Sequence, residues 1–456
     1  MTSKKLLSLI ITFSIININL LPAFSWGFLS KDKQVLNAQV SEYKYDYINL
    51  AWWESFDDAI LKSYILKAVD QNQDMKIATL KVEEYNQLVK KQFSYELPSA
   101  SLMPGLGSMK MPNETGSGIF NFPMVANYEA DIFLKNKDKT KAAKKQYEAS
   151  KFDERATYIA ISSAVAGTYL NLVKVDKLIT IQNDIISYKE QIYNLMMKRN
   201  KQGITSTADT VKADKELILA QTDLIELEKS KNILLNRLAV LTGESPANIA
   251  ELKRISYDDL KFKQEIPTEI PSEVIIKRPD ILRAENQLEK AGIDIRIARK
   301  EFLPSFNIMG LMLFSSSSLA SSFNWANSLA FFGSGATFSL FSGGQKMANL
   351  RIKKNAYEQL LQTYQKTNLT AIQEVNDSLS NLKLDDQKYN QNLEKLKLEE
   401  SELGYNEKRY AQGTISYLDL IQRKENLLTM NKTITSTKTD CLIDFISLYK
   451  ATGSQL

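Results

Sequence analysis

The sequence contains no histidine and a single cysteine, Cys441, among its 456 residues. These absences exclude His/Cys metal sites, Ser-His-Asp triads and disulfide frameworks. An exported enzyme built on paired carboxylates is left as a distant alternative, with Asp57-Asp58 and Glu83-Glu84 as its candidates. Because no pocket-forming pattern surrounds either pair, we expect no enzyme, no cofactor and no metal.

Proline is missing from two long stretches of the chain. All ten prolines lie at or before Pro304, and none falls between Pro123 and Pro246. Because proline breaks helices more strongly than any other residue, both stretches are free to form very long helices.

A large excess of one charge is also absent. The 58 Lys and Arg residues nearly balance the 53 Asp and Glu residues, and no basic block is interleaved with aromatic residues. We therefore expect no nucleic-acid partner.

The N-terminus has the layout of an export signal. Lys4 and Lys5 precede an apolar run, and Ala23 and Ser25 are small residues at the two positions that a signal peptidase inspects. This pattern predicts a secretory signal peptide over residues 1–25. The alternative is an N-terminal membrane anchor, for which the run is short. No cysteine lies near the cut, so no lipid anchor is predicted.

No later stretch reaches the roughly 18 apolar residues that a membrane-spanning helix needs. We therefore expect that any entry of the mature protein into a membrane uses strands.

The chain contains an internal repeat. Arg199-Asn-Lys-Gln-Gly203 recurs 210 positions later as Arg409-Tyr-Ala-Gln-Gly413. Further pairs share this offset: Tyr147 and Tyr357, Asn171 and Asn381, Asp209 and Asp419, Gly243 and Gly453. Further upstream, the Leu-Pro-Ser sequences at 97–99 and 303–305 match at an offset of 206. These matches predict two copies of one structural plan.

Each copy has a seven-residue apolar period. It is marked in the first by Val165, Leu172, Ile179, Ile186 and Tyr193, and in the second by Val375, Leu382, Tyr389, Leu396, Leu403 and Tyr410. Such a period predicts coiled-coil helices. The first runs from about residue 138 to 202, about 95 Å at 1.5 Å per residue, and turns back at Gly203. Helical hairpins are thus predicted over residues 134–243 and 342–453, with the second turn at Gly413.

Strands are predicted in two segments rich in Gly, Ser, Met and Phe, over residues 98–133 and 304–341. Polar and apolar residues alternate in Asn127–Phe133 and in Ala336–Phe341. Each segment can form two strands of the length that a tilted membrane strand requires. A soluble β-domain capping the coiled coil is the alternative. Four strands cannot close a channel, so strands in lipid would need several subunits to form one barrel.

The remaining boundaries follow from these elements. We predict an N-terminal segment and first short helix of repeat 1 over residues 26–97, and an equatorial or linker region over residues 244–272. The first short helix of repeat 2 is predicted over residues 273–303.

Several short motifs occur in a characteristic order. Trp52-Trp53 begins a segment that runs to Leu61, and Arg278-Pro279-Asp280-Ile281 opens the second copy. Arg409-Tyr-x-x-Gly413 and Leu448-Tyr-Lys-Ala-Thr-Gly453 follow. In this order, from about residue 50 to the C-terminus, the chain resembles the outer-membrane factors of tripartite efflux and secretion systems, the TolC-like channels. The drug-efflux (RND-type) branch is the most similar.

This resemblance implies a mainly α protein with a membrane β part. Three identical subunits would each give four strands to a twelve-stranded β-barrel in the outer membrane of a Gram-negative bacterium, among its lipids. A long coiled-coil α-helical barrel would continue it into the periplasm. The protein would be a passive exit duct for drugs and other small molecules, fed by an inner-membrane RND-type transporter through a periplasmic adaptor protein.

The resemblance also implies a gate at the periplasmic end, where the turns at Gly203 and Gly413 would lie. Asp419 matches the first aspartate of the family's pore constriction, and Gln422 stands where the second would be. A ring of three aspartates on an axis attracts cations and repels anions. Leu418 stands where some members place an apolar constriction.

A latch between neighbouring hairpins would accompany that gate. Tyr410 matches a tyrosine that latches in this family, and Asp209 or its neighbour Ala208 occupies the partner turn. Ile415 replaces the Arg of a second latch found in some members.

These site residues have structural alternatives. Asp209 and Asp419 could stabilise helix N-termini, and Arg199 and Arg409 could stabilise helix C-termini, through the helix dipole. Tyr410 could pack in the heptad core.

Two further motifs are interpreted structurally. Trp52 and Trp53 are expected to pack rather than to anchor at a membrane surface. Arg278, before Pro279 and Asp280, is expected to brace the start of a helix near the strand-to-helix transition.

Two other functions are left open. One is the exit duct of a type I protein secretion system. The other is an exported coiled-coil adhesin or scaffold, which would stay soluble without detergent.

Overall fold

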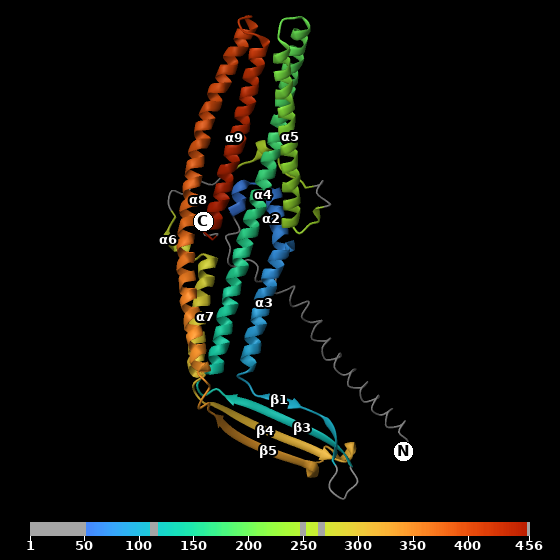
Figure 1. Cartoon of the computed structure of the whole chain (residues 1–456), viewed down its shortest axis with the longest axis vertical. Helices are drawn as coiled ribbons and strands as arrows, with labels where there is room; N and C mark the ends of the chain where they lie inside the picture. Colours follow the sequence, from blue (N-terminus) through green and yellow to red (C-terminus); the bar gives the residue numbers. More distant parts are fainter. Residues whose placement is uncertain (1–51, 110–116, 247–251, 263–269, 454–456) are drawn as a thin grey trace, which may run out of the picture. The chain divides into compact units, whose positions relative to one another are not determined.

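A computed structural model describes residues 52–109, 117–246, 252–262 and 270–453 (Figure 1). The predicted signal peptide lies outside these residues. The helices of the first copy are η1 (Trp52–Phe56), α2 (Ala59–Gln71), α3 (Gln73–Ser94), α4 (Lys135–Lys201) and α5 (Thr207–Leu241). The region between the copies contains η3 (Tyr257–Asp259). The helices of the second copy are α6 (Ser272–Ile276), α7 (Pro279–Lys300), η4 (Leu319–Ser321), η5 (Trp325–Asn327), α8 (Gln345–Ala411) and α9 (Tyr417–Ala451).

Two long helices organise the molecule. α4 and α8 each contain 67 residues, about 100 Å at 1.5 Å per residue. Toward the hairpin turns the helices lie in the order α5, α4, α9, α8, and toward the sheet in the order α3, α4, α7, α8 (Figure 1). α3 thus continues the line of α5, and α7 that of α9, so each long helix is matched by a pair of shorter ones.

The same joint connects the shorter helices in both copies. Asn72, the N-cap of α3, donates a hydrogen bond from Nδ2 to the carbonyl oxygen of Leu241, 3.0 Å away, near the end of α5. Arg278, the N-cap of α7, donates from Nη1 to the carbonyl oxygen of Ala451, the last residue of α9, at 2.6 Å. The duplication seen in the sequence is therefore present in the tertiary contacts.

The strands are β1 (Ser99–Leu102), β2 (Gly105–Met109), β3 (Ser117–Ala130), β4 (Ser305–Ser316) and β5 (Ser328–Thr337), and all their pairings are antiparallel. β1 and β2 pair with β3 in one register, with Leu102 opposite Met124 and Gly105 opposite Asn121. They form a single strand interrupted at Pro104, which has no N–H to donate. Each copy thus contributes two strands to one open sheet.

Two predicted strand ends are wrong. The strand predicted through Asn127–Phe133 stops at Ala130, because the Asp131 carboxylate accepts the backbone N–H groups of Lys135 and Lys137 and begins α4. The strand predicted through Ala336–Phe341 stops at Thr337, which pairs with the first residue of β4 and has no partner beyond it.

A buried core lies at mid-length, where α2 packs on α4 and η1 contacts α9. Trp52 and Trp53 are 4% and 2% exposed, and the Trp52 ring stacks on Tyr449 with centroids 4.6 Å apart. The Tyr169 hydroxyl donates to the Asp58 carboxylate at 2.7 Å, which fixes α2 on one face of α4.

One described helix could cross a membrane by length and composition alone. α4 contains an 18-residue window with a mean hydropathy of 1.3. We expected no such stretch after the N-terminus, so that prediction is wrong. Because 67% of this window is buried inside the protein, its apolar residues form core, as in a helical bundle.

Candidate functional site

The first part of the candidate site is the pair of hairpin turns. Gly203 and Gly413 have φ angles of 74° and 69°, in the left-handed region that glycine tolerates. The N–H groups of Ile204 and Thr414 each donate to the carbonyl five residues back, on Arg199 and Arg409, at 2.9 Å. This is the Schellman ending of a helix, and it explains why the same five-residue pattern recurs.

The return helices begin with a capping box. The Ser206 hydroxyl accepts the Asp209 N–H at 3.1 Å, and the Asp209 carboxylate accepts from the Ser206 N–H at 3.3 Å. In the second turn, Ser416 and Asp419 make the same two bonds at 3.2 and 3.1 Å. Both aspartates therefore satisfy backbone donors at helix N-termini, as the structural alternative expected.

Asp419 is also an exposed negative charge. Hydrogen bonds from the side chain and backbone of Ser416, with a smaller contribution from nearby Arg409 and Arg423, lower the pKa of its carboxyl group. Gln422, one turn further along α9, is likewise exposed. Both side chains are therefore accessible from outside the single chain.

Tyr410 lies outside the core. It is 41% exposed, and its ring lies 5.7 Å from that of Tyr417, whose hydroxyl donates to Gln191 at 2.9 Å. Among the described residues of this chain, no hydrogen bond joins Tyr410 to Asp209. Within a single subunit, Tyr410 therefore does not occupy a buried heptad core position.

Leu418 is directed into its own chain. It is half-buried and packs against a small cluster made by Ile192 of α4, Ala213 of α5 and Ile421 of α9. Within one subunit it links the two hairpins.

The sequence did not predict the ionic contacts between the hairpins. Lys189 of α4 lies 3.0 Å from the Glu216 carboxylate of α5 and 2.7 Å from that of Glu425 of α9. Burial of the Lys189 amine lowers its pKa, but the two carboxylates outweigh burial, so its pKa is raised. No motif marks this residue, and only the helical face that it shares with Gln182 could have suggested it.

The Arg278-Pro279-Asp280 motif forms the joint described above. Arg278 is 7% exposed, and its guanidinium contacts Asp280 at 2.7 Å, Glu374 of α8 at 2.6 Å and the end of α9. It does brace the start of a helix. Its predicted location near the strand-to-helix transition is wrong, because that transition lies at the other end of α7.

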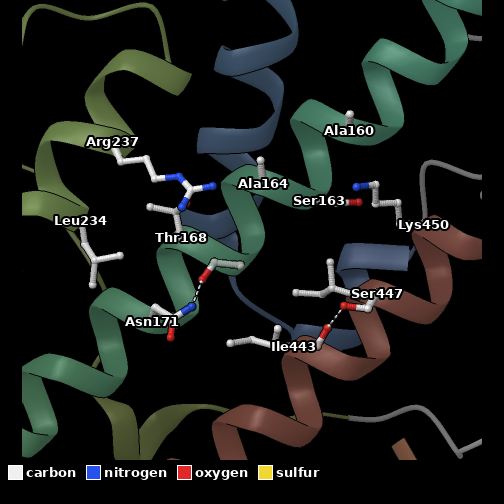
Figure 2. Close-up of a pocket in the computed structure, with 12 residues that line it drawn as sticks. Ala160, Ser163, Ala164, Thr168, Asn171, Leu234, Arg237, Ile443, Ser447 and Lys450 are labelled. Atoms are coloured by element: carbon white, nitrogen blue, oxygen red, sulfur yellow. Dashed lines mark hydrogen bonds between the residues drawn. The ribbon is translucent and has the colours of Figure 1, made fainter. Parts of the chain in front are cut away.

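A recess of about 300 Å³ lies between α4, α5 and α9 (Figure 2). Its floor is a strip of small residues on α4, including Ala160, Ala164 and Gly167. Arg237 of α5 and Lys450 of α9 approach it from opposite walls. Ala160 lies about two and a half turns before Tyr169, so this strip faces away from α2.

Sequence comparisons identify the family. The sequence profile described as outer membrane efflux protein matches residues 65–244 and 270–454. The toluene efflux pump outer membrane protein TtgC of Pseudomonas putida is 26% identical over 411 residues, covering 88% of this chain and 84% of that protein. The cation efflux system protein CusC of Escherichia coli is 26% identical over 418 residues, covering 90% and 89%.

Solved structures show the same fold. The Campylobacter jejuni CmeC outer membrane channel superposes with a TM-score of 0.81 at 23% identity, covering 90% of this chain and 89% of that one. The structure of CusC gives a TM-score of 0.76 at 24% identity, covering 88% and 94%. Duplicated helical hairpins joined to an antiparallel sheet are thus the fold of an outer-membrane channel subunit. The chain belongs to the outer membrane efflux protein family.

Proposed function

We propose that three copies of this chain form the exit duct of a tripartite efflux pump in the outer membrane of a Gram-negative bacterium. The observation that carries the proposal is the open sheet, whose edges β1/β2 and β5 have no partner strand in the described chain. Unpaired edges are too costly in lipid, so the sheet must be closed by other copies. Three copies supply the twelve strands that the family resemblance implies.

Exposed apolar side chains on the sheet support its placement in lipid. Leu329 and Phe331, which are 61% and 54% exposed, lie on one face of β5, where they pair with Leu313 and Leu311 of β4. A contiguous apolar surface of this kind marks contact with a membrane or a partner. The helices, which are richer in charge, then extend into the periplasm.

The duct is passive and catalyses nothing. Relatives of this chain are named for efflux of toluene, antibiotics and cations, and for pyoverdine export. Such diverse cargoes favour a conduit that leaves selection to an energised inner-membrane RND-type transporter, reached through a periplasmic adaptor. They favour this role over a protein-secretion duct or an adhesin.

The α4 face with the recess lines the duct in this proposal. η1 and α2 cover the opposite face, which makes that face the outside of the tube. Small side chains on α4 then keep the passage wide at mid-length, while Arg237 and Lys450 give this level a positive charge.

The gate lies at the hairpin turns. Three Asp419 carboxylates form a negative ring there, thinner than a double ring because Gln422 is neutral. Tyr410 contacts the partner turn at Asp209 in a neighbouring hairpin. Leu418 is a secondary candidate, because it is committed to packing within its own chain.

The direct test is purification in detergent followed by mass measurement and reconstitution in planar bilayers. A trimer that conducts ions in discrete steps is the expected result. A monomer that stays dissolved in plain buffer would contradict the proposal and favour the adhesin alternative.

A further inference from the structure

The helical layer has an unmatched long helix. Near the hairpin turns, α4 lies between two return helices, α5 and α9, whereas α9 is the only described helix that packs along α8 there. α8 is the copy of α4, and α5 is the copy of α9. Because α4 packs against α9 of the other hairpin, the repeat predicts that α8 packs in the same way against an α5. The α5 of its own chain is already packed at the far side of α4, so the missing neighbour must come from a second chain.

Apolar side chains remain exposed on both free edges. In the half of α8 toward the hairpin turn, Leu384, Leu398 and Tyr405 are 58% to 71% exposed. On α5, Val211, Ile218 and Ile225 are 48% to 61% exposed and lie seven residues apart. Seven-residue spacing is the pattern of a coiled-coil seam, so each stripe is shaped to pack against another helix.

The α4–α9 contact gives the residue pairing of that seam. Each α4 residue corresponds to the α8 residue 210 positions later, and each α9 residue to the α5 residue 210 positions earlier. The ion pair between Lys189 and Glu425, 2.7 Å apart, then falls on Glu399 and Lys215. Both charges are reversed, so the pair stays complementary.

The position that corresponds to Glu216, the third member of the ionic cluster around Lys189, also differs in the second copy. Lys189 also contacts Glu216 of its own hairpin at 3.0 Å. The matching position beside Glu399 is Asn426, which is neutral. An acidic residue at position 426 would repel Glu399. The three positions Glu399, Lys215 and Asn426 therefore remain electrostatically compatible with one another.

Neither Glu399 nor Lys215 has an ion-pair partner among the described residues of its own chain. Lys215 is exposed and Glu399 is half-exposed. Their apolar neighbours also match, because Tyr188 packs against the cluster containing Ile421, and the corresponding positions are Leu398 and Val211.

We propose that Glu399 of one subunit forms an ion pair with Lys215 of the partner subunit, and that this pair sets the register of α8 against the partner's α5. The proposal rests on the trimer proposed above and specifies its interface. The contact is heterologous, since different surfaces meet, so it repeats around a ring until the ring closes.

Charge reversal in the full-length protein tests the pair. Glu399→Lys and Lys215→Glu each place like charges together, so each lowers the temperature at which the detergent-purified oligomer dissociates. The double variant restores the attraction and recovers most of that loss. Glu400→Lys, an equal charge change at the next position, is the control that Lys215→Glu should not rescue. A double variant no better than the singles would overturn the pairing.

Cross-linking tests the register separately. In a Cys441→Ser background, Glu399→Cys with Lys215→Cys should give covalent dimers and trimers with a short bis-maleimide. Lys229→Cys replaces Lys215→Cys as the control, because it lies on the same stripe about 21 Å further along α5. Equal cross-linking at both positions, or none at Lys215→Cys, contradicts the inference.

Channel recordings separate this inference from the proposed function. A protein that conducts as a trimer but gives no Glu399–Lys215 cross-link retains its proposed function and loses only the proposed interface. A protein that neither assembles nor conducts loses both.

Discussion

Asp419 carries two roles that substitutions can separate. Its carboxylate accepts the Ser416 N–H at the start of α9, and it is exposed at the hairpin turn. Asparagine keeps an acceptor oxygen in place of the carboxylate but has no charge, whereas alanine has neither.

We therefore expect Asp419→Asn and Asp419→Ala to lose the same amount of cation selectivity, measured as the reversal potential in a salt gradient. Only Asp419→Ala should also lower the thermal unfolding midpoint, because it alone removes the side-chain acceptor of the Ser416 N–H and so half of the capping box. Unchanged selectivity in both variants would remove Asp419 from the gate.

Asp444 of α9 is a half-buried acid that the sequence did not mark. Burial, followed by a hydrogen bond and charge repulsion from Asp385 of α8, raises the pKa of its carboxyl group to about 6. A raised pKa favours the folded state below the unfolded value of 3.8, and this contribution is lost as the pH rises through 6.

Asp444→Asn should therefore stabilise the protein at pH 8, by about 1 kcal/mol after discounting for solvent screening. At pH 3.5 the gain should vanish, because the wild-type Asp444 side chain is then protonated and therefore neutral, like asparagine. Thermal unfolding midpoints at the two pH values provide the measurement, and a gain that does not depend on pH would contradict the assignment.

At the scale of elements, two glycines illustrate two different constraints. Gly203 and Gly243 both have positive φ angles, of 74° and 73°. A Cβ on Gly203 would meet open space, whereas one on Gly243 would lie 2.6 Å from the Gln71 carbonyl oxygen. Gly203 therefore serves only the turn, and Gly243 also lets the end of α2 approach the end of α5.

Gly203→Ala should destabilise the protein by about 1 kcal/mol, the cost of the left-handed conformation. Gly243→Ala should cost about 3 kcal/mol or more, because the backbone at the joint must also move. Thermal or denaturant unfolding compares the two. Equal losses would show that the joint is not closely packed.

The sequence predicted elements better than contacts. The recurring Arg-x-x-Gln-Gly turns and the seven-residue period were sufficient to locate both hairpins, because local chemistry determines a helix and its ends. The same period predicts Val165 and Leu172, which are fully buried, and Tyr410, which is exposed near a turn. Periodicity identifies a face of a helix, but the surrounding helices determine whether that face is covered.

Strand ends and side-chain pairs were beyond such reasoning. β5 ends where β4 begins, a limit set by the partner strand rather than by the Phe338–Phe341 sequence. Lys189 meets Glu425 across 236 positions of chain, and no local pattern joins them. The roles of Asp419, Tyr410 and the other gate residues stay predictions, because they concern contacts between subunits.

At the scale of the whole molecule, charge varies along the proposed duct. Arg237 and Lys450 adjoin the recess at mid-length, whereas Asp419 lies at the turns. In a trimer these become six positive charges at one level and three negative charges at another.

The double variant Arg237→Gln with Lys450→Gln should shift the reversal potential toward stronger cation selectivity. Lys62→Gln on α2 is the control, since that helix covers the outer face of α4. A shift as large in the control would show that the recess does not line the passage.

The joint at mid-length has a mechanical consequence. Two of the four helical lines are interrupted at mid-length, where α3 meets α5 and α7 meets α9, whereas α4 and α8 are continuous. Bending is easiest at this level, because only α4 and α8 resist it. For the proposed duct we therefore expect the hairpins to pivot at this level, so that the turns can move apart without a movement of the sheet.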